Sequence, residues 1–191
     1  MRRSNISPKL LVSLANAYKK QPKPEEIFHY MYALLYSNAY RTKYAEFLKG
    51  DFPRIPFTKD YKFFKKLAEK GEDLVELHLL RSKRLAEPIA KCEGSGDLRV
   101  EKLTYDQSKA CVHINPKKWF TGVDADVWEY HIGGYQVAEK WLKDRKAREL
   151  SSEEVAHYAK LITAISETIK IQKSLDHLFA EVETSLLEVR L

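Results

Sequence analysis

The spacing of apolar residues changes twice along the chain, and this change limits the fold more than any other feature. Apolar residues first recur every three or four positions, as on one face of a helix. Residues 98–115 instead alternate apolar and polar side chains, which is the period of a strand with one buried face. The helical spacing returns from Val137 onward. Helices, a small antiparallel sheet and helices again predict an α+β fold.

The length of 191 residues suits one domain. We therefore predict a single domain over residues 1–191, in three sections. Residues 1–88 are expected to be mainly helical, residues 89–134 to hold β-hairpins, and residues 135–191 to be helical. Neither an internal repeat nor a low-complexity tract interrupts this order.

Proline marks the start of two helices in the first section. Ser7 precedes Pro8, and Pro24 precedes a pair of glutamates. Proline is favoured at the first helical position, where its missing N–H is not needed. A third helix is predicted over residues 39–50, and "DFPRIPF" after it reads as an extended connector.

The remaining elements follow from caps, turns and period. Thr58 is expected to cap a helix from Tyr61 to about residue 81, strained or broken at Gly71. Residues 98–106 and 109–115 read as a hairpin joined by "DQS", and residues 127–132 as a third strand. Ser151 and Glu154 form a capping-box pattern that starts the last helical stretch.

Charge is unevenly distributed along the chain. The formal net charge is +6, yet residues 151–191 hold four Lys/Arg against seven Asp/Glu. The preceding residues therefore carry an excess of nine positive charges. A basic body suits a polyanion such as nucleic acid, and the acidic end suits a protein neighbour or solvent.

Several functional classes lack their sequence signals. We see no signal peptide and no apolar run near the roughly 18 residues that span a membrane. Cys92 and Cys111 are too few and too distant for a disulfide framework, which favours the cytoplasm. Neither a metal-ligand spacing nor a phosphate-binding glycine loop is present. We expect no catalytic residue and no metal site in this chain.

The glycine pair Gly133-Gly134 raises a specific question. It stands between the predicted strand at 127–132 and a helix with basic residues, so its N–H groups could hold a phosphate. Glycines also allow a sharp turn with close backbone packing. Spacing alone favours the turn, and the basic helix that follows keeps the phosphate hypothesis open.

Two groups of polar and basic residues are candidates for DNA contact. Side chains on a β-ribbon can read base edges in the major groove, and a basic helix can bind phosphates. In the hairpin region the candidates are Lys102, Tyr105, Lys109, His113, Asn115, Lys117 and Lys118. Around and after the glycines they are Gly133, Gly134, Lys140, Lys143, Arg145 and Lys146.

Five segments together resemble one protein family. They are "NISPKLL", "IFHYMYALLYSNAYRTKYAEFLKGDFPRIPF", "LVELHLL", "VWEYHIGGYQVAEKWLKDRK" and "LSSEEVAHYAKLITAISETIK". They resemble the C-terminal target recognition domain of type ISP restriction–modification enzymes, over nearly the whole chain. Such enzymes are single polypeptides that join a nuclease, a helicase-like ATPase, an N6-adenine methyltransferase and this domain in phage defence.

The resemblance implies a sequence-reading module and no catalyst. This chain would bind double-stranded DNA and position the target adenine for the methyltransferase. S-adenosylmethionine, ATP and magnesium would belong to the methyltransferase and helicase portions, with no cofactor in this chain. Arg41 and Arg54 lie within a family-like segment and are expected to contact phosphate or the methyltransferase.

Two other functional classes stay open. An interaction or regulatory module that docks through the C-terminal helices would bind a protein and no DNA. An enzyme with an unrecognised site would need a cluster of titratable groups in a pocket. The residues that read bases are not given by the resemblance, because members with different target sequences differ at those positions.

Overall fold

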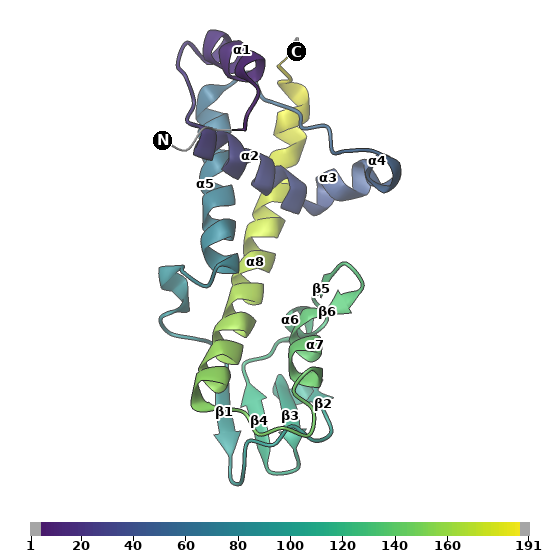
Figure 1. Ribbon diagram of the computed structural model, residues 1–191. Coiled ribbons are helices and arrows are strands. Elements are labelled where there is room, and N and C mark those ends of the chain that lie inside the picture. Colours follow the sequence, from purple (N-terminus) through teal and green to yellow (C-terminus); the bar gives the residue numbers. More distant parts are fainter. Residues whose placement is uncertain (1–4, 188–191) are drawn as a thin grey trace. The chain divides into compact units, whose positions relative to one another are not determined.

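The computed structural model describes residues 5–187, and these residues form two compact units (Figure 1). Unit 1 comprises residues 5–76 and 170–187, and unit 2 comprises residues 77–169. Helix α8 (Ser152–Thr184) contributes residues to both units. The α+β class is confirmed, and the single domain over residues 1–191 stays a prediction.

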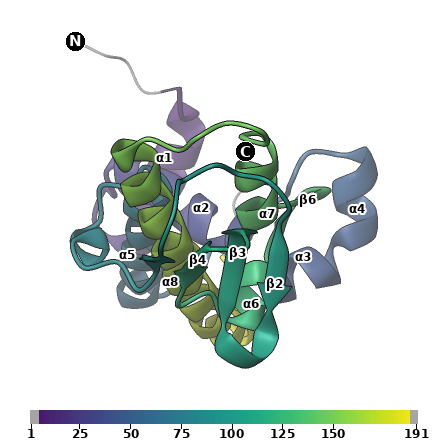
Figure 2. The same cartoon turned by 90° about the horizontal axis from the view of Figure 1, so that it is seen from below.

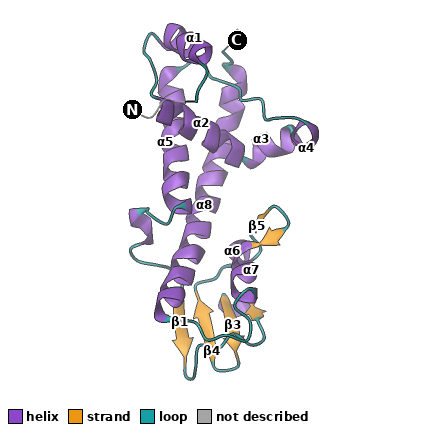
Figure 3. Ribbon diagram, viewed as in Figure 1, coloured by secondary structure: helices purple, strands orange, loops and turns teal. Residues whose placement is uncertain are grey.

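Unit 1 is helical (Figure 3). Its helices are α1 (Pro8–Tyr18), α2 (Pro24–Tyr36), α3 (Asn38–Lys43), α4 (Ala45–Gly50), most of α5 (Tyr61–His78) and the last part of α8. The predicted starts at Pro8 and Pro24 are confirmed. The predicted helix over residues 39–50 is instead two short helices, because the chain leaves helical geometry at Tyr44.

Two predictions about α5 are wrong. Asp60 caps this helix, since its carboxylate accepts hydrogen bonds from the N–H groups of Lys62 (2.7 Å) and Phe63 (3.2 Å). Thr58 instead accepts from the N–H of Asp60 at 3.2 Å. Gly71 does not break the helix. It is buried, and the backbone of His29 in α2 lies where a Cβ would stand.

Asp176 of α8 fixes the junction between α2 and α3. Its carboxylate accepts from the Ser37 hydroxyl at 3.0 Å and from the Ala39 N–H at 2.9 Å. Ser37 is fully buried, and its own hydroxyl oxygen accepts from the N–H of Tyr40. The break between the two helices is therefore held by a residue 139 positions away in the chain.

Unit 2 contains every named strand in the described part of the chain. A four-stranded antiparallel sheet has the order β1-β4-β3-β2, and Figure 2 shows β4, β3 and β2 side by side. The strands are β1 (Lys91–Gly94), β2 (Thr104–Asp106), β3 (Cys111–Asn115) and β4 (Lys118–Thr121). The predicted hairpin is confirmed as β2–β3. A short 3-10 turn, η2 (Gln107–Lys109), joins its strands, and a second such turn, η1 (Lys83–Leu85), precedes β1.

The predicted strand over residues 127–132 is wrong. Helix α6 (Ala125–Trp128) ends there, and only β5 (His131–Ile132) is a strand. Strand β5 pairs with β6 (Tyr135–Gln136), which leads directly into α7 (Val137–Lys143). Val127 and Trp128 are both buried although they are adjacent, which a strand with one buried face cannot achieve.

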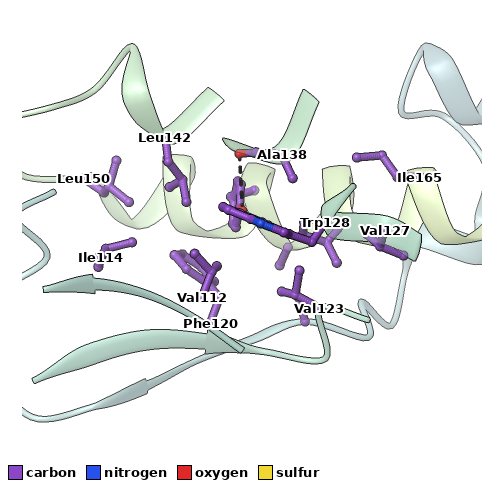
Figure 4. Close-up of a cluster of buried hydrophobic side chains, with 14 of the residues drawn as sticks. Val112, Ile114, Phe120, Val123, Val127, Trp128, Ala138, Leu142, Leu150 and Ile165 are labelled. Atoms are coloured by element: carbon purple, nitrogen blue, oxygen red, sulfur yellow. Dashed lines mark hydrogen bonds between the residues drawn. The ribbon is translucent and has the colours of Figure 1, made fainter. Parts of the chain in front are cut away.

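One face of the sheet packs on helices and forms the core of unit 2. Val112 of β3 faces its strand partner Phe120 of β4, and both are fully buried. The ring of Phe120 meets Tyr158 of α8 edge-on, with centroids 4.6 Å apart. Figure 4 shows Val112 and Phe120 pointing from the strands toward the side of the cluster where Leu142 lies. This core positions the polar segments described next.

Candidate nucleic-acid interface

Four basic side chains line one hollow on the surface of unit 2. The hollow has a volume of about 630 Å³ and is lined by Arg99, Val100, Glu101, Lys102, Leu103, Glu139, Lys143, Lys146 and Ala147. We call it the basic hollow, after Arg99, Lys102, Lys143 and Lys146. Lys102, Lys143 and Lys146 were predicted from the sequence to bind DNA, and they lie together here. Arg99 was not predicted.

Backbone hydrogen bonds hold the two walls of the basic hollow together. The N–H of Val100 donates to the carbonyl of Arg148 at 2.9 Å, and the N–H of Ala147 donates to the carbonyl of Val100 at 2.7 Å. The Arg99 guanidinium also donates to the carbonyl of Ala147 at 2.9 Å. Residues 98–103 therefore follow the segment after α7 instead of extending β2 to the predicted length.

The cations of the basic hollow differ in whether a carboxylate of the chain already pairs with them. Lys143 pairs with Glu139, one helical turn away, at 2.7 Å. Lys102 and Lys146 are exposed and form no ion pair within the part of the chain that the structure describes. An ammonium group without a carboxylate partner can bind an external anion without losing an internal bond. These two lysines are the strongest candidates for phosphate contact.

Arg145 is engaged inside the unit. Its guanidinium lies 3.5 Å from the centroid of the Trp141 ring and donates to the Trp141 carbonyl at 2.9 Å. It also donates to Glu154 at 3.1 Å. Contact between Arg145 and a phosphate would compete with these bonds. Lys140 is likewise paired, with Asp144 one turn along the chain.

Glu154 ties the turn after α7 to the start of α8. It accepts from Arg148 at 2.6 Å and from the N–H of Ser151 at 3.0 Å, and its own N–H donates to the Ser151 hydroxyl. The predicted capping box is therefore confirmed. The hydrogen bonds from Arg148, from the Ser151 backbone and from Arg145 lower the pKa of Glu154 to about 2.

Asn115 is a structural residue in this fold. It is only 6% exposed. Its amide donates to the carbonyls of Asp97 (3.2 Å) and Arg99 (3.0 Å) and accepts from the N–H of Lys117 (2.9 Å). Asn115 thus closes the turn that carries Arg99 to the basic hollow. Reading a base with this amide would break the bonds that shape the turn.

Tyr105 also has a structural role. Its hydroxyl donates to the carbonyl of Val123 at 2.9 Å, and its ring stacks on Trp128 with centroids 5.0 Å apart. Burial, followed by the charge of Asp124, raises the pKa of this hydroxyl. The ring supports the core beside α6.

The other strand candidates lie apart from the basic hollow. His113 and Trp119 are strand partners with ring centroids 5.4 Å apart. Lys118 donates to the carbonyl of Gly94 at 2.9 Å, and Lys109 lies 3.8 Å from Asp106 in the η2 turn. Lys117 is exposed. None of these residues lines the hollow, and their contact with DNA stays a prediction.

Gly133 and Gly134 form the turn of the β5–β6 hairpin. They do not stand at a helix N-terminus, because β6 and the cap residue Gln136 separate them from α7. Gly133 has φ of +59°, which favours glycine, and nothing lies within 4 Å of a Cβ added at either position. The predicted sharp turn is confirmed, but it joins two strands and the expected close backbone packing is wrong. The position at a helix N-terminus, on which the phosphate hypothesis depended, is also wrong.

Arg41 and Arg54 belong to unit 1 and line two other hollows. Arg41 and Lys49 line a shallow one of about 570 Å³ beside α3 and α4. Arg54, which is 3.6 Å from Asp51, lines a smaller apolar one of about 170 Å³ with Phe47 and other residues.

Exposed aromatic side chains surround the smaller hollow. Phe47 is 65% exposed and Phe52 is 90% exposed. We call this pair the aromatic patch. This patch was not predicted from the sequence. The spacing of apolar residues in a helix as short as α4, or in the connector after it, does not show which of them lack a packing partner.

Residues 5–187 also bear on metal binding, thiol chemistry and membrane insertion. Within that range, no three or more His, Cys, Asp or Glu side chains lie close enough together to hold a metal ion. Cys92 and Cys111 are unpaired, and burial raises the pKa of both thiols. Every helix in the same range is too short or too polar to span a bilayer.

The basic hollow, with four cations and two carboxylates in its lining, suits an anionic ligand. Comparison with known families then identifies the chain more closely. Residues 1–174 match the type ISP C-terminal specificity domain, and the chain belongs to that family. A search of curated protein sequences finds no significant match.

Solved structures with the same fold include three larger proteins, two of which are type ISP restriction–modification enzymes. A cryo-EM structure of a DrdV–DNA complex has 25% identity and a TM-score of 0.72 over 90% of this chain. The type ISP enzyme LlaBIII bound to DNA has 21% identity and a TM-score of 0.66 over 92%. A nuclease-deletion mutant of the type ISP enzyme LlaGI, in complex with a DNA substrate mimic, has 24% identity and a TM-score of 0.59 over 82%.

This chain is much shorter than those proteins. The matched region covers 20% of the DrdV chain, 16% of the LlaGI chain and 12% of the LlaBIII chain. The matches at 24% and 21% identity concern the fold.

Proposed function

We propose that this chain recognises a specific sequence in double-stranded DNA as the specificity domain of a type ISP restriction–modification enzyme. It would position the target adenine for a separate methyltransferase portion. Membership of the specificity-domain family supports the proposal, as does the likeness to DrdV, whose solved structure is a DNA complex. The observation that carries it is the basic hollow of unit 2.

The composition of the basic hollow suits a phosphate backbone. Two of its four cations, Lys102 and Lys146, are exposed, and Lys143 forms an ion pair with Glu139. Each phosphate that a lysine neutralises releases a condensed counterion, which favours binding at low salt. The backbone bonds between the two walls fix the main chain of these residues before DNA arrives, so the backbone loses little conformational freedom on binding.

Salt dependence tests this function. Replacing Lys102 and Lys146 by Ala removes two phosphate contacts, so the slope of log affinity against log salt falls by about 1.8. Affinity for all duplex sequences is expected to fall alike. The matched control is Lys91→Ala/Lys160→Ala, which removes two exposed lysines of unit 2 outside the hollow. Equal slopes for both double variants would refute the role of the hollow.

The methyltransferase portion of the same enzyme is the proposed protein partner, and the aromatic patch is its proposed docking surface. Phe52, at 90% exposure, leaves a large apolar area in water, and aromatic and arginine side chains are enriched where proteins bind each other. Arg54 lies beside it. Docking through the C-terminal helices, the other protein-binding hypothesis, would have to use the exposed side of α8, because Phe179 and Val182 are buried inside unit 1.

Cofactor chemistry is assigned to the other portions of the enzyme. S-adenosylmethionine, ATP and magnesium would bind the methyltransferase and helicase portions, and this chain would contribute recognition only. The expected location is the cytoplasm, where the bacterial DNA is found.

The aromatic patch is tested by co-expression with a type ISP methyltransferase portion. Wild type is expected to co-purify with it and Phe47→Ser/Phe52→Ser is not, and equal recovery would refute the docking surface.

A further inference from the structure

The main sheet of unit 2 carries a row of polar and aromatic side chains on the face opposite its core. His113 of β3 stands between Val112 and Ile114, which both belong to that core. Because adjacent residues of a strand point to opposite faces, His113 points away from the core. The strand register places it opposite Trp119 of β4 and opposite Thr104 of β2, the three strands that Figure 2 shows side by side. We call Thr104, His113 and Trp119 the outer row.

The rings of the outer row are held in place and remain partly accessible. Thr104 is exposed, and the two aromatic members are half-buried. The Trp119 ring lies over Gly94 of β1, where an added Cβ would stand 2.6 Å from its Cζ3. The His113 ring lies on its other side in the row, with centroids 5.4 Å apart. The indole is therefore ordered before any ligand arrives, so little side-chain freedom is lost when one binds.

Each member of the outer row offers a polar atom to a ligand. The Thr104 hydroxyl, the Trp119 indole N–H and the Nδ1 of His113 form no hydrogen bond with any residue in the described part of the chain. The Nε2 of His113 lies 3.6 Å from the Cys111 sulfur. A hydroxyl donates and accepts, an imidazole nitrogen does one or the other according to its tautomer, and an indole N–H donates. Unlike Asn115, these groups can bind a ligand without breaking a bond that shapes the fold.

The size and position of the outer row suit a groove of DNA beside the basic hollow. Neighbouring strands are about 4.8 Å apart, so a row across three strands spans about 10 Å. The major groove of B-DNA is about 12 Å wide. Thr104 follows Lys102 of the hollow by two residues, so one end of the row adjoins the cations. The other end meets Glu93, the strand partner of Trp119. Its carboxylate repels phosphates, so the contact with DNA is expected to end there.

We infer that the outer row contacts base edges in the major groove of duplex DNA while the basic hollow holds the adjacent phosphates. This inference rests on the proposed function. A threonine hydroxyl can bind either base of a pair, and an apolar surface such as the indole can contact a thymine methyl group. Of the three residues, only His113 was a candidate from the sequence. All three lie within residues 81–126, outside the five family-like segments, as residues that differ between members with different targets must.

Repeated selection from a random duplex pool tests the inference on the full 191-residue chain. Wild type is expected to enrich one motif. Thr104→Val keeps the shape of an exposed side chain and removes its hydroxyl, and His113→Gln replaces the imidazole by an amide. Each variant is expected to enrich a motif altered at one base pair and to bind the wild-type motif about tenfold more weakly. Affinity for a scrambled duplex and the salt slope are expected to stay near wild type, whereas Lys102→Ala/Lys146→Ala lowers both.

His157→Gln is the matched control. His157 is also an imidazole stacked on a tryptophan, with its centroid 5.6 Å from that of Trp141. It belongs to α8, which packs on the core face of the sheet through Tyr158, and it lies within a family-like segment. This variant is expected to leave the motif and both affinities unchanged. Far-ultraviolet circular dichroism of each variant confirms that the fold is retained.

The outcomes distinguish the inference from the proposed function. An unaltered motif in both Thr104→Val and His113→Gln would overturn the inference, as would equal weakening of the motif duplex and the scrambled duplex. A motif altered to the same extent in His157→Gln would overturn it as well. A wild-type chain that binds DNA and enriches no motif would overturn the inference and leave DNA binding intact. A wild-type chain that binds no duplex at low salt would overturn the proposed function together with the inference.

Discussion

Gly71→Ala tests a close contact between α5 and α2 in unit 1. A Cβ built at Gly71 in α5 lies 1.8 Å from the carbonyl oxygen of His29 and 2.6 Å from its carbonyl carbon. Real Cβ contacts are not found below 3.0 Å. The obstruction is backbone, so rotating a side chain cannot relieve it. Helix α2 therefore has to move away from α5 by more than about an ångström, which would disturb the packing between the two helices.

The expected free-energy change has two opposing contributions. Alanine in a helix interior is favoured over glycine by about 1 kcal/mol. Overpacking that shifts backbone costs about 1–3 kcal/mol and occasionally more, and the shift also weakens contacts such as the stack of Tyr30 on Phe64, with centroids 4.9 Å apart. Because the contact is backbone to Cβ, the steric cost dominates. We expect Gly71→Ala to lower the free energy of unfolding by about 2 kcal/mol.

Urea unfolding followed by far-ultraviolet circular dichroism measures this change. Gly50→Ala is the matched control, because Gly50 ends a helix and a Cβ there meets nothing within 4 Å. The control is expected to stay within about 0.5 kcal/mol of wild type. Tryptophan fluorescence reports separately on unit 2, which contains all three tryptophans, Trp119, Trp128 and Trp141. A Gly71→Ala protein as stable as the wild type, or more stable, would refute the close contact.

Two further predictions concern the turns that shape the basic hollow. The pKa of Glu154 is lowered to about 2 in the folded chain, so its stabilising effect is present above the ordinary pKa near 4.5 and is lost as pH falls toward 2. The melting temperature of Glu154→Gln is therefore expected to fall less between pH 5 and pH 2.5 than that of wild type, and parallel curves would contradict the assignment. Asn115→Ala removes three hydrogen bonds from a buried site. It is expected to lower the free energy of unfolding by about 2–3 kcal/mol, measured by urea unfolding, and a change below 0.5 kcal/mol, the ordinary limit for surface positions, would argue against this role.

Local signals predicted the ends of several helices correctly. Pro8 and Pro24 have no N–H that would stay unpaired in the first turn of a helix. Ser151 and Glu154 pair each other's backbone N–H groups. Such contacts depend on residues three or four positions apart, so the sequence displays them directly.

Strands β1 and β4 and the region around residues 127–132 were not predictable in the same way. Each strand in the main sheet is at most five residues long, too short for alternation to stand out from its flanks. Helix α6 replaces the predicted strand because burial of Trp128 against Tyr105 outweighs the β preference of its residues.

The candidate site was predicted in part. The sequence showed the basic residues at 102 and 140–146, but these side chains have different partners in the structure. Arg145 is held by Trp141 and Glu154, whereas Lys146 beside it lines the hollow and forms no ion pair with any other described residue. Sequence cannot separate two such residues, because the difference depends on which carboxylates and rings the fold brings near.

The α+β class, several helix starts, the excess of positive charge before residue 151 and the family resemblance could all be predicted without a structure. These depend on period, on caps and on composition, which are properties of neighbouring residues or of the whole chain. By contrast, the contact between Arg99 and the segment around Ala147, 48 positions away, is visible only in the folded chain. The same is true of the burial of Asn115 and of the exposure of Ile132 and Tyr135 in the β5–β6 hairpin. Such features arise from long-range backbone pairing and core packing, which fix side chains whose separation along the chain carries no periodic signal.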